Sequence, residues 1–183
     1  MKAEERDKTV KITFISNLLG PHQLPFCKAM VNRLGEDFKF VATEPMTEER
    51  IKLGWSLDKD TYPFEIKANE SNELQKKAEQ LAIESDVVII GSAPDSYIIP
   101  RLKRNKLTFK YSERPLKKGI HWNNLAHIIC GMWLHHGRFQ SKPLYMLAAS
   151  AYTADDYARF GCYRGKCYKW GYFPEAKNMI RMS

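Results

Sequence analysis

Short runs of consecutive apolar residues recur along the chain, and between them lie longer segments whose apolar residues are three or four positions apart. The first pattern is typical of buried strands, and the second is typical of helices that bury one face. Strands are therefore expected at residues 12–16, 38–42, 64–67, 87–90, 107–111, 144–149 and 167–170. Helices are expected at residues 24–34, 71–82, 121–136 and 153–160, with shorter ones at 47–55 and 97–102.

The order of these elements predicts the fold class. The run at 87–90 (VVII) has no polar alternation, which suits a strand covered on both faces, as in a parallel sheet. Strands and helices alternate throughout, so we expect an α/β, Rossmann-like three-layer sandwich with a mostly parallel sheet of about seven strands. Residues 1–183 are expected to form a single domain, because no linker, repeat or low-complexity segment interrupts the alternation.

Two local signals predict where shorter helices begin or end. The helix at 97–102 is expected to break at or near Pro100, because proline lacks the N–H that a helix interior needs. Residues 153–156 (TADD) have the form of a capping box, in which a threonine side chain and an acidic side chain satisfy the first N–H groups of a helix. The sequence therefore predicts a capped helix start at residue 153.

The helix at 121–136 carries an apolar face that includes Trp122, Ile129 and Trp133 at helical spacing. Cys130 lies within the same apolar pattern and is expected in the core. The helix ends on the pair His135-His136, and adjacent residues do not share a helix face, so a two-histidine metal site is not expected there. A favourable contact between histidine and the negative end of the helix is the simpler account.

Composition narrows the class of protein. The chain has 183 residues, 44% of them apolar, and no run of about 18 apolar residues that would span a membrane. Residues 1–8 are mostly charged and do not resemble a secretory signal, so the cytoplasm is the expected compartment. Cys162 and Cys167 have no partner cysteines or histidines at zinc-site spacing, so no metal site is expected.

The formal net charge of +8 predicts attraction to anions. Part of this charge lies in a basic stretch that begins with Arg101, Lys103, Arg104 and Lys106. The stretch is either a solvated face or a surface that contacts an anionic membrane. Nucleic acid is a weaker interpretation, because aromatic residues are not interleaved with the basic ones.

Ligand groups are expected in the loops after the strands, because the carboxyl edge of a parallel sheet forms the binding crevice. The informative loops are 17–23, 91–95 and 111–115. In the first, Gly20 serves either a tight turn or the close approach of a ligand, and His22 is either a donor or base for a ligand or an exposed bystander. The loop lacks the spaced glycines of a dinucleotide site and the lysine of a P-loop.

The other two loops offer hydroxyl, carboxylate and guanidinium groups. Ser92 and Asp95 suit the hydroxyls of a sugar, but a helix cap is the favoured interpretation of Asp95. Glu113 and Arg114 follow the fifth expected strand, where a carboxylate can bind sugar hydroxyls or take a proton from one. A surface ion pair is the alternative for these two residues. No nucleophile elbow or serine–histidine–acid order is present.

Several segments resemble one known family. Residues 12–17 (ITFISN) and 20–23 (GPHQ) resemble the opening of retaining glycosyltransferases with the two-domain GT-B fold. Residues 86–91 (DVVIIG), 111–114 (YSER) and 169–175 (KWGYFPE) resemble later parts of the same amino-terminal half. In place of the histidine that many members carry after the fourth strand, this chain has residues 92–95 (SAPD).

The resemblance implies that the chain is the acceptor-binding half of such an enzyme. A donor-binding carboxyl-terminal domain, absent from this chain, would carry a pair of glutamates, and the Gly20 loop would lie under the donor phosphates. It implies a nucleotide sugar as co-substrate of the whole enzyme, no cofactor in this chain, and a glycan or lipid-linked acceptor. It further implies that the chain is inactive alone and that its basic stretch contacts an anionic membrane.

A different class of protein fits the same pattern. A stand-alone flavodoxin-like module that binds a phosphate-bearing small molecule needs no partner domain. Sugar transfer and small-molecule binding therefore both remain open from the residues alone.

Overall fold

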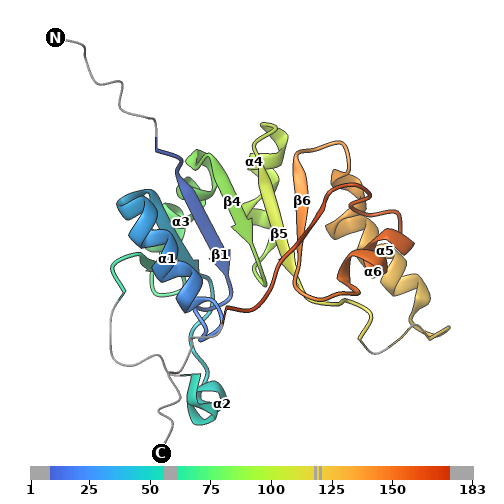
Figure 1. Ribbon diagram of the computed structural model, residues 1–183, viewed down its shortest axis with the longest axis horizontal. Helices are drawn as coiled ribbons and strands as arrows, with labels where there is room; N and C mark the ends of the chain where they lie inside the picture. Colours follow the sequence, from blue (N-terminus) through green and yellow to red (C-terminus); the bar gives the residue numbers. More distant parts are fainter. Residues whose placement is uncertain (1–8, 56–61, 118, 120, 174–183) are drawn as a thin grey trace, which may run out of the picture.

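A computed structural model describes residues 9–55, 62–117, 119 and 121–173 of the chain. Within them, one parallel sheet of seven strands has the order β3-β2-β1-β4-β5-β6-β7 (Figure 1). The strands are β1 (Ile12–Ser16), β2 (Phe38–Ala42), β3 (Glu65–Lys67), β4 (Val87–Ile90), β5 (Thr108–Ser112), β6 (Leu144–Ala148) and β7 (Cys167–Lys169). The predicted α/β, Rossmann-like fold with a parallel sheet of seven strands is confirmed.

The helices cover both faces of this sheet. They are α1 (Leu24–Leu34), α2 (Glu48–Arg50), α3 (Asn72–Glu84), α4 (Ile99–Lys103), α5 (Leu125–His135) and α6 (Thr153–Arg159). Short helical turns are η1 (Gly35–Asp37), η2 (Ile51–Trp55), η3 (Asp95–Tyr97) and η4 (Gly137–Phe139). The charged residues 1–8, Lys118 and the last part of the KWGYFPE segment, from Pro174 on, lie outside the described residues.

Two apolar cores lie on the two sides of the sheet. Successive strand residues point to opposite faces, so Phe14 of β1 joins one core and Ile15 joins the other. The Phe14 core packs against α1, which contributes the buried Cys27. The Ile15 core packs against α3, whose Ala78 and Ala82 are fully buried. This double cover explains why the strands are apolar on both faces.

The sheet order reverses between β1 and β4. β1 pairs with β2 on one side and with β4 on the other. The connections after β1 and β4 therefore leave in opposite directions, and a crevice opens between them at the carboxyl edge. The loops at 17–23, 91–95 and 111–115 all leave this edge, after β1, β4 and β5.

The helix expected at 121–136 is shorter than predicted and turns its apolar residues outward. α5 begins at Leu125, and Met132 is its one buried residue. Trp133, Ile129 and Cys130 are exposed, so the prediction that Cys130 lies in the core is wrong. Helical periodicity identifies an apolar face but does not say what covers it. Among the described residues, no helix is long and apolar enough to cross a membrane.

Three predictions about helix ends have different outcomes. Pro100 lies in the first turn of α4, where its missing N–H is tolerated, and the break falls nearby at Ile98, between η3 and α4. The other two predictions are wrong. No side chain caps α6, because the carboxylate of Asp156 accepts from the Arg114 side chain instead. Asp95 does not cap a helix either, since Pro94 holds the cap position of η3.

Arg101 is wholly buried, so its expected place on a membrane-contacting surface is wrong. Its guanidinium donates to the carbonyls of Ala82, Ser85, Asp86 and Leu107 and to the hydroxyl of Thr108. Burial lowers the pKa of Arg101 to about 10, and the nearby charge of Asp86 opposes that shift. Arg101 thus fastens the end of α3 to the start of β5.

The other members of the basic stretch differ in exposure. The Lys106 ammonium donates to the carbonyls of Ile83 and Glu84, at 2.8 Å and 3.0 Å, and so caps the end of α3. Lys103 and Arg104 are exposed. Membrane contact by this pair stays a prediction.

We expect Arg101→Met to lower the free energy of unfolding by about 3 kcal/mol, because several buried carbonyls lose their donor at once. Lys103→Met, an exposed position on the same helix, should change it by less than about 0.5 kcal/mol. Urea denaturation of both variants measures the difference. Equal stability of the two variants would contradict a structural role for Arg101.

Candidate functional site

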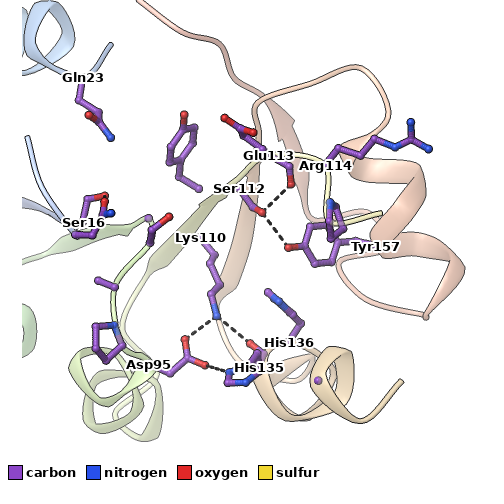
Figure 2. A pocket seen from close by; sticks show the side chains of 18 of the residues that line it. Ser16, Gln23, Asp95, Lys110, Ser112, Glu113, Arg114, His135, His136 and Tyr157 are labelled. Atoms are coloured by element: carbon purple, nitrogen blue, oxygen red, sulfur yellow. Dashed lines mark hydrogen bonds and ion pairs between the residues drawn. The ribbon is translucent and has the colours of Figure 1, made fainter. Parts of the chain in front are cut away.

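A cleft of about 910 Å³ lies at the carboxyl edge of the sheet, where the loops after β1, β4 and β5 meet α5 (Figure 2). Five of the six predicted site residues line it: His22, Ser92, Asp95, Glu113 and Arg114. They come from three loops far apart in sequence, and the sheet brings them together as parallel strands end at one edge.

Gly20, the sixth predicted residue, is not among the residues that line this cleft. Its N–H donates to the side-chain oxygen of Gln23 at 2.8 Å. A Cβ at this position would lie 2.9 Å from that oxygen and 3.3 Å from the ring of Trp55. Glycine is therefore needed for the close packing of Gln23 and Trp55, and both of these side chains face the cleft.

An ion-pair network forms the floor of the cleft. The Lys110 ammonium lies 2.6 Å from Oδ1 of Asp95 and donates to the carbonyl of His135 at 3.1 Å. The second carboxylate oxygen of Asp95 lies 2.7 Å from Nδ1 of His135 (Figure 2). Asp95 and Lys110 are each about nine-tenths buried, whereas His135 is mostly exposed. The network therefore joins η3, β5 and the last turn of α5.

Burial and pairing act in opposite directions on these charges. Burial alone would raise the pKa of Asp95, but the charge and hydrogen bond of Lys110, together with His135, lower it below its ordinary value of 3.8. Burial lowers the pKa of Lys110 from 10.5, and the pairing with Asp95 only partly opposes this shift. Asp95 is consequently a carboxylate at neutral pH, with both oxygens already bound.

His136 lies behind this floor in an aromatic pocket. Its ring contacts the rings of Tyr157 and Tyr163 at centroid distances of 4.7 Å and 5.5 Å, and its Nδ1 lies 2.8 Å from the Tyr163 hydroxyl. Burial, and then the charge of Lys110, lower the pKa of His136 to about 3. The imidazole is therefore neutral at physiological pH.

One wall of the cleft is formed by the end of β5 and by α6. The Ser112 hydroxyl lies 3.0 Å from that of Tyr157, and Arg114 donates to the buried carboxylate of Asp156 at 2.8 Å. Glu113 pairs with Lys117, and both of these side chains are well exposed. Glu113 thus remains accessible to a ligand, while Arg114 is anchored to α6.

Aromatic rings form the opposite rim, which we call the aromatic rim (His22, Trp55 and Tyr172). The ring of His22 lies 5.9 Å from Trp55 and 5.2 Å from Tyr172, between centroids. The guanidinium of Arg50 lies 5.4 Å from the ring of Trp55. Such a rim offers flat apolar surface beside a cation at the entrance of a polar cleft.

Sequence reasoning missed several of these residues. Lys110 belongs to the basic stretch that begins with Arg101, for which a solvated or membrane-contacting face is expected, although a lone lysine inside an apolar strand is itself a signal of a buried pair. His135 and His136 do face different ways, as adjacent residues should, but Asp95 and Tyr163 were not foreseen as their partners. In the part of the chain that the structure describes, no group of three or more histidine, cysteine or acidic side chains could hold a metal ion.

We expect Asp95→Asn to lower the free energy of unfolding by about 3 kcal/mol, because Lys110 would keep a buried charge without a counterion. The double variant Asp95→Asn/Lys110→Met should regain part of this loss. Glu70→Gln breaks the exposed 3.7 Å pair with Lys67 and should cost less than about 1 kcal/mol. A double variant no more stable than Asp95→Asn, in urea denaturation, would contradict the pairing.

The neutral state of His136 predicts a pH dependence. In the unfolded chain His136 binds a proton near pH 6.5, whereas in the folded chain it does so only near pH 3. The folded state therefore loses stability as the pH is lowered through this window. From pH 7 to pH 5 the loss due to His136 should be about 2 kcal/mol. His136→Asn should remove it, and His127→Asn, at an exposed position, should not. Urea titrations at both pH values test this, and an unchanged slope in His136→Asn would refute it.

A scan against protein-family models gives no match to this chain, and a search of curated protein sequences gives none either. Among solved structures, the chain is similar to UDP-N-acetylglucosamine 2-epimerase from Rickettsia bellii, with 12% sequence identity and a TM-score of 0.48. The alignment covers 90% of this chain and 45% of the epimerase chain. This chain therefore spans less than half the length of the epimerase.

Proposed function

We propose that this chain is the acceptor-binding half of a GT-B glycosyltransferase, which transfers a sugar from a nucleotide sugar to a glycan or lipid-linked acceptor. The observation that carries the proposal is the composition of the cleft. Hydroxyl and carboxylate groups from the loops after β4 and β5 lie opposite the aromatic rim, in one cavity of about 910 Å³. A sugar ring presents hydroxyl groups around its edge and C–H groups on its faces, and this cleft offers partners for both.

The individual groups divide between binding and positioning. Glu113 is accessible and can accept a hydrogen bond from an acceptor hydroxyl, or take its proton as the hydroxyl attacks. Ser92 and His22 offer further donors at the cleft wall. Asp95 is fully engaged by Lys110 and His135, so we assign it the role of holding the loop of Ser92 in place.

A two-domain enzyme explains what this half lacks. Sugar transfer needs groups that stabilise the departing phosphate, an acceptor hydroxyl held in line, and the exclusion of water that would otherwise hydrolyse the donor. On this chain the N–H of Gly20 is bound to Gln23, and Arg114 is bound to Asp156. A second lobe that closes over the carboxyl edge would supply the donor site and exclude water.

We expect the 183-residue protein to bind oligosaccharides in the cleft. Trp55→Ala should lower the affinity about tenfold through loss of the ring contact, and Glu113→Gln should lower it about tenfold through loss of an acceptor for a sugar hydroxyl. Glu73→Gln, on the exposed side of α3, is the matched control. A glycan array followed by calorimetry with the best oligosaccharide measures the effect. Binding that survives Trp55→Ala and Glu113→Gln would contradict the proposal.

Two further outcomes bear on the class of protein. We expect no sugar transfer from UDP- or GDP-sugars by the purified 183 residues alone, because in the proposed two-domain enzyme the second lobe forms the donor site. Transfer by this chain would show that it is not half of the site. Binding of phosphorylated small molecules without glycan binding would instead favour the flavodoxin-like module.

A further inference from the structure

Large apolar side chains are exposed along one side of α5. We call this side the outer face of α5 (Trp122, Ala126, Ile129, Cys130 and Trp133). Trp122 is 93% exposed, Trp133 60% and Ile129 50%, and Ala126 and Cys130 between them are exposed as well. Ala126, Ile129, Cys130 and Trp133 lie within about 100° of one another around α5, and Trp122 lies in the turn just before the helix. Exposed tryptophans at both ends of such a stripe are unusual on a free surface.

The outer face points away from the cleft. The residues of α5 that line the cleft are His127, Ile128, Gly131, Met132 and His135. Each residue advances about 100° around a helix, so this set is centred opposite the outer face. α5 also lies beyond β6, toward the end of the molecule (Figure 1). The stripe is therefore a separate surface that the proposed acceptor site does not use.

The surrounding segment carries positive charge only. Between residues 114 and 154 the sequence has five basic residues and no aspartate or glutamate. Two of the five are paired with acids that lie just outside this segment: Arg114 with Asp156, and Lys117 with Glu113. Arg138, which follows α5, is exposed and stacks on Phe139 at 4.5 Å. The outer face is thus followed by an exposed cation, Arg138, within a stretch of sequence that is basic and holds no acid.

We infer that the outer face of α5 docks on the surface of an anionic lipid bilayer. A short helix with an apolar side, tryptophans at the polar–apolar boundary and basic flanks is the pattern of interfacial binding. The indole ring suits this boundary because its body is apolar and its N–H is polar. Basic side chains add attraction to anionic lipid headgroups within a Debye length of the surface.

The charge distribution disfavours a second copy of the chain as the occupant. A twofold interface through α5 would place the same basic segment of both copies face to face, which like-charge repulsion opposes. The eleven residues of α5 span about 16 Å, too short to cross the hydrocarbon core, so the helix must lie in the plane of the surface.

The outer face of α5 is distinct from the membrane surface expected at residues 101–106, where Arg101 is buried and Lys106 is bound to the end of α3. Membrane contact by Lys103 and Arg104 stays a separate prediction. The assignment of the outer face is also independent of the proposed function, because the outer face and the cleft are opposite sides of one helix. If both hold, the cleft lies about one helix diameter, roughly 10 Å, from the lipid surface.

The test uses the full chain and vesicles of phosphatidylcholine, with or without phosphatidylglycerol, in a co-sedimentation assay. We expect binding to the anionic vesicles that weakens with added salt, and a loss of about tenfold or more in Ile129→Glu/Trp133→Glu, because each exposed apolar contact is lost. Leu53→Glu, which also changes an exposed apolar residue but lies in η2, is the matched control and should bind as the unaltered chain does.

A second measurement needs no substitution. Tryptophan fluorescence of the unaltered chain should be quenched by vesicles that contain brominated phosphatidylcholine and phosphatidylglycerol, and Trp122→Phe/Trp133→Phe should abolish that quenching. Absence of quenching, or equal vesicle binding by Ile129→Glu/Trp133→Glu and the unaltered chain, would overturn the inference. So would a dimer in analytical ultracentrifugation that Trp133→Glu dissolves, in the absence of vesicle binding.

Discussion

Two opposite charges, Asp95 and Lys110, meet at 2.6 Å beneath the cleft, and each is about nine-tenths shielded from water. A buried charge without its partner costs several kcal/mol, so neither side chain can leave unless the other is neutralised. The carboxylate also binds His135, and the ammonium also binds the carbonyl at the end of α5. The loop after β4, the strand β5 and the last turn of α5 are therefore held in one arrangement, and the cleft residues of these three segments depend on it.

A second buried cation fixes the opposite end of the same strand. Arg101 donates to Leu107 and Thr108 at the start of β5 and to the carbonyls at the end of α3. The segment that contains η3 and α4 thus begins at Asp95, which is bound to Lys110, and reaches Arg101, which is bound to the first residues of β5. Because both ends are fixed, residues 95–101 have little freedom, and Ser92 lies only three residues before the fixed Asp95.

The strands were predictable because each one depends on local pattern: runs such as VVII can satisfy their apolar faces only inside a doubly covered sheet. The meeting of the loops after β1, β4 and β5 followed from parallel topology alone. Whether each charged side chain is buried or exposed could not be predicted from the sequence. A count of lysines and arginines cannot distinguish Arg101, with its carbonyl partners, from the exposed Lys103. Gly20 was expected to serve a tight turn or the approach of a ligand, and it does not line the cleft. The close approach of the Gln23 and Trp55 side chains to Gly20 includes a tertiary contact that the sequence does not reveal.

α5 shows most directly why an apolar pattern in the sequence does not determine which side of a helix is buried. Its apolar period predicts one buried face, yet the face toward the protein carries His127 and His135, and the stripe from Trp122 to Trp133 is exposed. The inner side of α5 needs polar groups, because the end of the helix supplies a carbonyl to Lys110 and an imidazole to Asp95. The same side also packs Met132 and Ile128 against the core, while the larger apolar residues Ile129 and Trp133 face solvent. Exposed apolar surface of this kind is costly in water, and a lipid surface is an environment that would remove this cost.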